Sequence, residues 1–322
     1  IGGGTTDLGI NEYFLDHAAS TGGSARGGST IVPEQRFRDG FRIAGDDIVL
    51  DVLNEMVTPA VARAMAEAGV ADPDAIISKL MGSEQLDAHD ALLRQQLTLQ
   101  IFYPVGLRII KAYESYDPLE AGNLGKLSIR ELLEDREPPN QAVLSYINDA
   151  VQRAAQGSRG EQPPFSIMDV AVQINLRKLH MSFIRGMPNI CKSLQSLAEV
   201  IYHFRPDVLL MTGRPSRLPG ILAFVQSLHA IPSHRIISMH GYRTGGWYPF
   251  HRNGRIDDPK STAAVGAMIC LLSKEGKVPN FYFRSGSFKP YSTVRHLGRI
   301  DNTNTIEDSA VYYRDINIDV DD

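Results

Sequence analysis

The feature that most constrains the fold is an alternation of helical stretches with short apolar runs beyond residue 188. Residues 188–204 carry apolar side chains at helical spacing, and residues 207–211 form a continuous apolar run typical of a strand buried on both faces. Further elements are expected as a helix over 218–228, a strand over 235–239 and a helix over 261–272. Helices that alternate with strands favour a parallel or mixed sheet covered by helices, so the sequence predicts an α/β fold.

The chain begins with a glycine-rich turn, Ile1-Gly2-Gly3-Gly4-Thr5-Thr6-Asp7. Three successive glycines allow positive φ angles and carry no Cβ, so backbone N–H groups can close on an oxyanion. The threonine hydroxyls add donors, and the Asp7 carboxylate is a candidate to hold the water shell of Mg²⁺. A polar hairpin turn explains the same run without a ligand. Such a turn needs a preceding strand, which predicts that a parent protein continues upstream of Ile1.

Strands and a helix are expected directly after the turn. Residues 8–15 alternate as a strand does, residues 21–30 have the composition of a flexible loop, and residues 36–43 resemble a third strand. Asp46 or Asp47 is then expected to N-cap a helix. The same carboxylates are candidates to face a ribose, although capping explains one of them without any ligand.

Between about residues 60 and 160 the apolar periodicity is almost wholly helical, and the prolines separate or interrupt the helices. Helices are expected over 61–68, 74–81, 87–116, 129–136 and 142–155, and a linker over 156–164. We therefore expect a core of residues 1–60 and 165–277, a helical insertion at 61–164, and a β-like or irregular extension at 278–322.

Two further segments resemble ligand-binding or packing elements. At 207–221 a predicted strand ends in a Thr-Gly turn and a helix begins near Pro219, where free N–H groups can meet a ligand. A strand-to-helix turn without a ligand explains this segment equally. At 258–269, Asp-Pro opens a helix rich in Ala and Gly, which is expected to serve close packing.

These four segments, in this order, resemble the actin/Hsp70/FtsA ATPase superfamily. Residues 1–7 are similar to its second phosphate loop, Asp-x-Gly-Gly-Gly-Thr-x-Asp, without the leading Asp. Residues 44–48 are similar to its Gly-Gly-x-Asp-Phe step, 207–221 to its adenosine motif, and 258–269 to the helix that follows. The likeness covers residues 1 to about 60 and 165 to 275, roughly half of the chain.

The resemblance implies the second lobe of an actin-like (ribonuclease H-like) ATPase with a mostly helical inserted subdomain, and ATP or ADP with Mg²⁺ as cofactors. It assigns Gly2, Gly3, Gly4, Thr5 and Thr6 to the phosphates, Asp7 to the metal's water shell, Gly45 and Asp46 to the ribose, and Gly213, Arg214, Ser216 and Arg217 to the adenosine. Arg217 is the strongest candidate to stack on adenine. Arg214 stands where the family usually has glycine, and the sequence does not decide whether it crowds or contacts the nucleotide.

The resemblance also implies a first lobe elsewhere in the parent chain, so these 322 residues are expected to bind ATP without hydrolysing it. The alternative is a non-hydrolysing scaffold with the helical insertion at 61–164 as its partner surface. The chain further resembles the bacterial SrfB family, described as virulence-associated. The resemblance lies in the sequence of residues 212–220, the long helical insertion and the unusual tail.

Composition limits other classes of function. The net charge of 33 − 37 = −4 favours neither nucleic acids nor anionic membranes, no run of eighteen apolar residues is present, and two distant cysteines indicate a reducing, cytoplasmic location. Aromatic and basic residues mix over 277–299, but the acidic segment 301–322 that follows favours pairing within the protein over nucleic-acid binding. The spacing of His229, His234, His240 and His251 matches no common metal motif.

Overall fold

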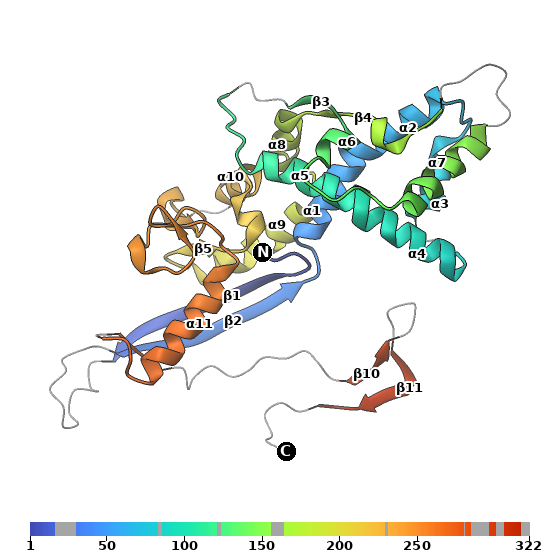
Figure 1. Ribbon diagram of the computed structural model, residues 1–322. Helices are drawn as coiled ribbons and strands as arrows, with labels where there is room; N and C mark the ends of the chain where they lie inside the picture. The colour runs from blue at the N-terminus through green and yellow to red at the C-terminus, as the bar shows by residue number, and fades with distance from the viewer. Residues whose placement is uncertain are drawn as a thin grey trace. The chain divides into compact units, whose positions relative to one another are not determined.

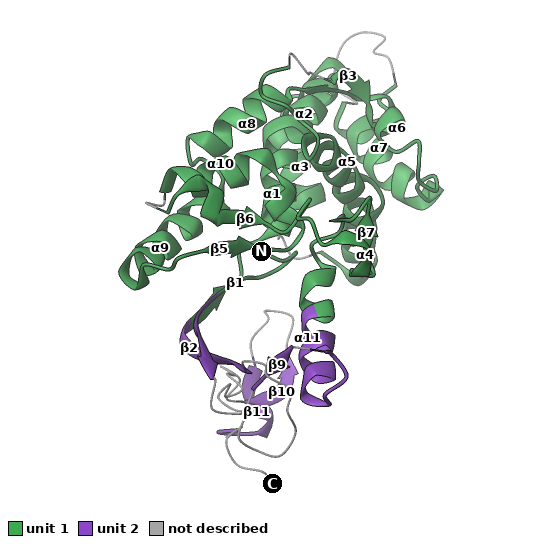
Figure 2. Ribbon diagram, turned by 90° about the vertical axis from the view of Figure 1, so that its left-hand side faces the viewer, with its two compact units in different colours: residues 1–8, 38–265 green, residues 9–37, 266–322 purple. Residues whose placement is uncertain are grey.

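The computed structural model describes residues 1–16, 30–82, 86–120, 124–155, 164–228, 231–279, 281–284, 296–300 and 306–316. The chain divides into two compact units, coloured separately in Figure 2. Unit 1 comprises residues 1–8 and 38–265, and unit 2 comprises residues 9–37 and 266–322. Several predicted segments lie outside the described residues, namely most of the loop at 21–30, most of the linker at 156–164, and His229.

Helices dominate unit 1 (Figure 1). In chain order they are α1 (Gly45–Val52), α2 (Thr58–Glu67), α3 (Pro73–Met81), α4 (Ala88–Leu97), α5 (Tyr103–Tyr113), α6 (Ile129–Leu132), α7 (Gln141–Ala155), α8 (Leu176–Ile184), α9 (Asn189–Phe204), α10 (Pro219–Leu228) and the start of α11 (Ser261–Lys274). The helices predicted near 74–81, 142–155, 188–204, 218–228 and 261–272 are confirmed to within two residues. The helix predicted over 129–136 is shorter, because it ends at Leu132.

Short strands accompany these helices in three two-stranded sheets. They are β3 (Gly125–Ser128) with β4 (Ala171–Ile174), antiparallel; β5 (Leu209–Met211) with β6 (Ile236–Ser238), parallel; and β7 (His251–Arg252) with β8 (Arg255–Ile256), antiparallel. The strand predicted at 207–211 is therefore β5, but it is not buried on both faces, since Leu210 is 60% exposed. Short helical turns η4 (Ile167–Asp169), η5 (Arg214–Arg217), η6 (Ser233–Arg235) and η7 (Gly245–Trp247) complete the unit.

Two long helices continue past proline residues through π-helical turns. A five-residue π-helical turn, η2 (Leu53–Val57), joins α1 to α2, and Pro59 follows it. A second π-helical turn, η3 (Thr98–Phe102), joins α4 to α5, and Pro104 follows it. Proline lacks an N–H and clashes with the carbonyl four residues earlier, and the wider turn accommodates both effects. The helix predicted over 87–116 is thus one continuous helical segment over 88–113.

Unit 1 has one continuous hydrophobic core. Ile48 and Val52 of α1, Phe102 beside α5, Phe183 of α8 and Ile221 of α10 all belong to it. The predicted division at 61–164 therefore does not coincide with the two units, because the helices of that stretch bury their apolar faces in the same core as α1 and α8.

A glycine brings α1 and α5 close together. A Cβ added to Gly106 of α5 would lie 2.7 Å from Val49 Cγ1 of α1, so only a glycine permits this approach. The close contact places the first turn of α5 beside the first turn of α1, which is the region of the site described below.

Unit 2 is mainly β-structure. Its three-stranded sheet has the order β1 (Thr6–Asp16), β2 (Thr30–Phe41), β9 (Tyr282–Phe283), and β2 and β9 are parallel. Before α1 the described residues thus form two long strands, where three strands were predicted. β10 (Leu297–Ile300) and β11 (Ile306–Tyr313) form an antiparallel pair within the segment beyond residue 278 that was predicted to be β-like or irregular.

Candidate functional site

The glycine turn at the start of the chain is hydrogen-bonded to the start of α1. The N–H of Gly2 donates to the Thr5 carbonyl at 2.7 Å, which closes the turn. The carbonyls of Gly2 and Gly3 accept from the N–H groups of Gly45 and Asp46 at 3.0 and 2.8 Å. These two N–H groups at the helix start therefore serve the protein and are not open to a ligand.

The opposite side of the same turn carries N–H groups without a hydrogen-bond acceptor among the described residues. The N–H groups of Gly3 and Gly4 donate no hydrogen bond to any described part of the chain. Because a trans peptide is planar, each of these N–H groups points opposite to the carbonyl bonded to α1, so both point away from that helix. Two neighbouring free N–H groups that point the same way can bind an oxyanion.

Glycine at these two positions is not required by the fold. None of the three glycines of the turn has a positive φ, so the turn does not use the freedom to adopt positive φ angles that the sequence suggested for Gly2-Gly3-Gly4. A Cβ on Gly4 would meet nothing within 4 Å, and one on Gly3 would make only ordinary contact with the Asp46 carboxylate. The absence of these side chains leaves the backbone open to a close approach from outside.

The rest of the turn differs from the predicted roles. The Thr6 hydroxyl is buried and donates to the Ile43 carbonyl at 2.7 Å, so it braces β1. The Thr5 hydroxyl donates to the Asp7 carboxylate at 3.2 Å. Asp7 lines a separate small pocket with Ile1 and Met211, and it does not reach the pocket beside the glycine turn.

Helix α1 is capped differently from the prediction. Its N-cap residue is Ala44, and the Asp47 carboxylate accepts a hydrogen bond from the Ala44 N–H at 2.7 Å. Asp47 is thus the capping carboxylate, although it lies inside the helix. Asp46 remains available, and Tyr103 of α5 donates its hydroxyl to Asp46 Oδ1 at 3.0 Å.

The Thr212–Pro215 turn lies against the glycine turn. The Ile1 amino group donates to the Thr212 carbonyl at 2.9 Å. Gly213 has φ +83°, and a Cβ there would overlap the Ile1 carbonyl, so this position needs glycine on both grounds. The buried Ser216 hydroxyl donates to the Gly213 carbonyl at 2.6 Å, so Ser216 supports the turn.

The fourth predicted segment joins the same place. The Thr212 hydroxyl donates to the Pro259 carbonyl at 2.8 Å, and Lys260 lies at the edge of the pocket. Segments from residues 1–3, 44–46, 212–215 and 259–260 thus meet, although more than two hundred residues separate the first from the last.

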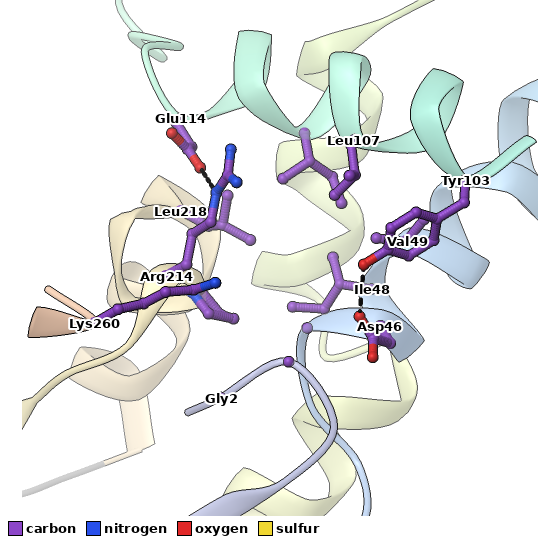
Figure 3. A pocket seen from close by; sticks show the side chains of 14 residues that line it. Gly2, Asp46, Ile48, Val49, Tyr103, Leu107, Glu114, Arg214, Leu218 and Lys260 are labelled. Carbon is purple, nitrogen blue, oxygen red and sulfur yellow. Dashed lines mark hydrogen bonds and ion pairs between the residues drawn. The ribbon is translucent and has the colours of Figure 1, made fainter. Parts of the chain in front are cut away.

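These segments border a pocket of about 210 Å³ (Figure 3). Figure 3 shows Arg214 and Lys260 on one side of it and the hydrogen-bonded pair of Asp46 and Tyr103 on the other. Its lining residues are Gly2, Gly3, Gly45, Asp46, Ile48, Val49, Tyr103, Leu107, Ile110, Glu114, Arg214, Pro215, Leu218 and Lys260.

Helix α5 and the residue after it supply a wall that the sequence analysis missed. Tyr103, Leu107, Ile110 and Glu114 recur at spacings of four, three and four, so they lie on one helical face. That periodicity is the signal that could have identified them. Burial, followed by the hydrogen bond to Asp46, raises the pKa of Tyr103, so its hydroxyl remains a donor further into the alkaline range.

Glu114 holds two of the predicted adenosine residues. Its side chain is 6% exposed; Oε1 accepts from Arg214 Nε at 2.8 Å, and Oε2 lies 3.3 Å from Arg217 Nε. Arg214 reaches the pocket, whereas Arg217 does not line it. The guanidinium available to a ligand in this pocket is therefore that of Arg214 and not that of Arg217.

Within the described residues, no three His, Cys, Asp or Glu side chains gather as a metal site. In the same residues, no helix is both long enough and apolar enough to cross a bilayer. Cys191 and Cys270 are both free thiols.

Comparison with known proteins identifies one family. The family model described as "Virulence factor SrfB" matches residues 1–322, and the chain belongs to this family. No curated protein and no solved structure matched the chain significantly.

Proposed function

We propose that this member of the SrfB family binds an adenine nucleotide as the second lobe of an actin/Hsp70-like ATPase. The observation that carries the proposal is the pair of free N–H groups at Gly3 and Gly4, on a turn that borders a pocket lined by Arg214 and Lys260. Free backbone donors beside two cations are the groups that recognise phosphate.

The pocket offers a suitable group for each part of the nucleotide. The free N–H group of Gly3, which lines the pocket, and the Lys260 ammonium suit the phosphates. The hydroxyls of a ribose suit Asp46 and its partner Tyr103. The faces of an adenine ring suit three apolar side chains and one guanidinium of the pocket, those of Leu107, Ile110, Leu218 and Arg214.

Mg²⁺ would arrive bound to the phosphates, whose charge it neutralises. This ion keeps most of its waters and needs only one or two protein carboxylates. Asp46 lies at the pocket beside the glycine turn, whereas Asp7 does not line it. We therefore assign the carboxylate nearest the metal's water shell to Asp46 in place of Asp7.

The pocket suits binding better than hydrolysis. Its carboxylates are Asp46, assigned above to the ribose and the metal's water shell, and Glu114, which is bound by Arg214 and Arg217, so neither is left to act as a general base. Its volume of about 210 Å³ lies below the roughly 300–1,000 Å³ of pockets that enclose a ligand. A first lobe, which the superfamily resemblance implies, would close the cleft, and dependence on ATP would place the protein in the cytoplasm.

Calorimetric titration of the 322-residue chain with ATP and ADP, each with Mg²⁺, tests the proposal. We expect both nucleotides to bind, and Gly3→Val to weaken binding at least tenfold, because its methyl groups cover the turn beside Asp46. Gly9→Val is the matched control, since that exposed glycine also has room for a Cβ but lies in β1 outside the pocket. Absence of nucleotide binding, or an equal effect of the two substitutions, would refute the proposal.

The alternative function is a scaffold without nucleotide. Leu92 of α4 and Leu99 of η3 are seven residues apart, and each is 52% exposed, which gives the helical stretch a small apolar strip open to a partner protein. The same titration separates the two functions, because a scaffold gives no heat with either nucleotide.

A further inference from the structure

Three arginines lie side by side on a small three-stranded ladder within unit 1. Arg255 of β8 pairs with Arg252 of β7, and on its other side it forms an antiparallel bridge with Arg243. Directly opposite residues of antiparallel strands have Cβ atoms about 4.5–5.5 Å apart and point to the same face. The three side chains therefore form one row, in the order Arg243, Arg255, Arg252, which we call the arginine row.

The arginine row faces outward. Ile256, the residue after Arg255, is only 2% exposed, and successive side chains of a strand point to opposite faces. The face with Arg255 is thus the solvent face, and all three arginines are exposed.

Within the described residues, the three guanidinium groups make one weak contact with the fold, a 3.5 Å hydrogen bond from Arg255 Nη1 to the Gly241 carbonyl. Like charges directly opposite each other on a sheet are destabilising. Within the described residues, none of the three guanidinium groups forms an ion pair with a carboxylate. Residues 240–256 contain no Asp or Glu; the next two, Asp257 and Asp258, are not ion-paired with the row, and Asp258 caps the following turn. A row of unneutralised arginines with a cost to folding indicates an external anion.

The loop that joins the outer strands of the ladder presents aromatic rings. Trp247 is 61% exposed and Phe250 is 56% exposed. Both contact the ring of Tyr248 edge-on, at centroid distances of 5.6 and 6.5 Å. Tyr248 is buried, and its hydroxyl is 2.7 Å from that of Ser261, so the two exposed rings rest on a fixed base.

We propose that residues 240–256 bind single-stranded nucleic acid, with phosphates on the arginine row and bases stacked on Trp247 and Phe250. Proteins that bind single strands without sequence preference combine a basic path for the backbone with aromatic rings for the bases. An acidic peptide would satisfy the arginines but would leave the exposed rings without a partner, so the observations favour the nucleic acid.

Trp247 is the only tryptophan in the chain, so intrinsic fluorescence reports on the site itself. Titration with a 20-nucleotide oligodeoxythymidylate is expected to quench its emission. The logarithm of the binding constant should fall against the logarithm of salt concentration with a slope of about −2, as expected for three phosphate contacts on a single strand. Poly-glutamate and phosphatidylserine vesicles are the competing probes. Quenching by either of these at equal charge, or no quenching by the oligonucleotide, overturns the proposal.

Substitutions separate binding from folding. Arg252→Ala should reduce the salt slope by about 0.7, whereas Arg177→Ala, which removes an exposed arginine of α8, should leave it unchanged. Phe250→Ala should weaken binding about fivefold or more. Arg255→Glu should abolish binding yet leave the melting temperature equal or higher, because it places a carboxylate between two arginines. A lower melting temperature for Arg255→Glu would show that the row serves the fold and would overturn the proposal.

Discussion

The contact of Glu114 with two arginines gives the most direct test of how the pocket is built. In Glu114→Gln the side chain keeps its size but loses its charge. The amide oxygen can face Arg214 and the amide NH₂ group Arg217, or the oxygen can face Arg217 and the NH₂ group Arg214. One of the two arginines is thus left facing a donor, and their mutual repulsion is no longer offset.

The magnitude follows from burial. A hydrogen bond to a charged group contributes about 1.5–3 kcal/mol when its removal leaves a buried partner unsatisfied. Glu114 is buried, but Arg214 and Arg217 are 39% and 26% exposed, so solvent compensates part of the loss. We expect the free energy of unfolding to fall by about 1–2 kcal/mol, which lowers the melting temperature by about 3–6 °C in a unit of this size.

Differential scanning calorimetry of the wild type, Glu114→Gln and the control Glu199→Gln measures this effect. Glu199 is exposed on α9, so its substitution should change the melting temperature by less than about 1 °C. A double-mutant cycle with Arg214→Gln should return a coupling of about 1 kcal/mol. Affinity for ADP should rise in Glu114→Gln, because the pocket loses one negative charge. Equal melting temperatures for the two glutamate variants would refute the interpretation of Glu114.

Three further predictions concern the core and the turn. Gly220→Ala should lower the free energy of unfolding by about 2–3 kcal/mol in urea titrations, because its Cβ would lie 2.6 Å from Phe183 Cβ in the core; an unchanged midpoint would contradict this. Burial lowers the pKa of His180, so below about pH 6.5 the unfolded chain binds more protons than the folded chain. The free energy of unfolding should therefore fall as the pH drops from about 7.5 to about 5.5. His180→Gln should flatten this pH dependence, and an equally steep curve for the variant would exclude His180 as its source. Gly213→Ala should both lower the melting temperature and weaken nucleotide binding, since φ +83° and the Ile1 carbonyl oppose a Cβ; wild-type behaviour in both assays would show that the turn relaxes freely.

The sequence predicted most helices because their periodicity is local. The helix at 188–204 needed only its own apolar spacing to be found as α9. The helix through Pro104 was predicted as one element over 87–116, whereas the helices on either side of Pro59 were predicted as separate. Proline acts as a breaker in isolation, and a π-helical turn that lets the helix continue past it is not visible in local periodicity. The sequence also could not predict that Leu210 is exposed, because its exposure depends on which elements pack beside β5, and tertiary structure decides that.

For the site, the sequence predicted which segments meet, but not which of their groups face the pocket. The motifs at 1–3, 44–46 and 212–215 do meet, because each is a turn whose backbone bonds to another. The Thr6 and Ser216 hydroxyls donate inward to backbone carbonyls, which the sequence could not show, since a hydroxyl in a tight turn can donate inward as readily as outward. Glu114 was missed because it belongs to a helix far from the motifs in sequence.

The direction of the peptide units at the glycine turn decides where an anion can bind. A helix N-terminus is the usual anion site, but the N–H groups of Gly45 and Asp46 are already bonded to the turn's carbonyls. Those same bonds fix the N–H groups of Gly3 and Gly4 on the opposite side of two planar peptides. The anchoring of the turn and its anion-binding capacity are therefore two consequences of one arrangement. A substitution that loosens the turn from α1 should weaken phosphate binding even where it touches no phosphate.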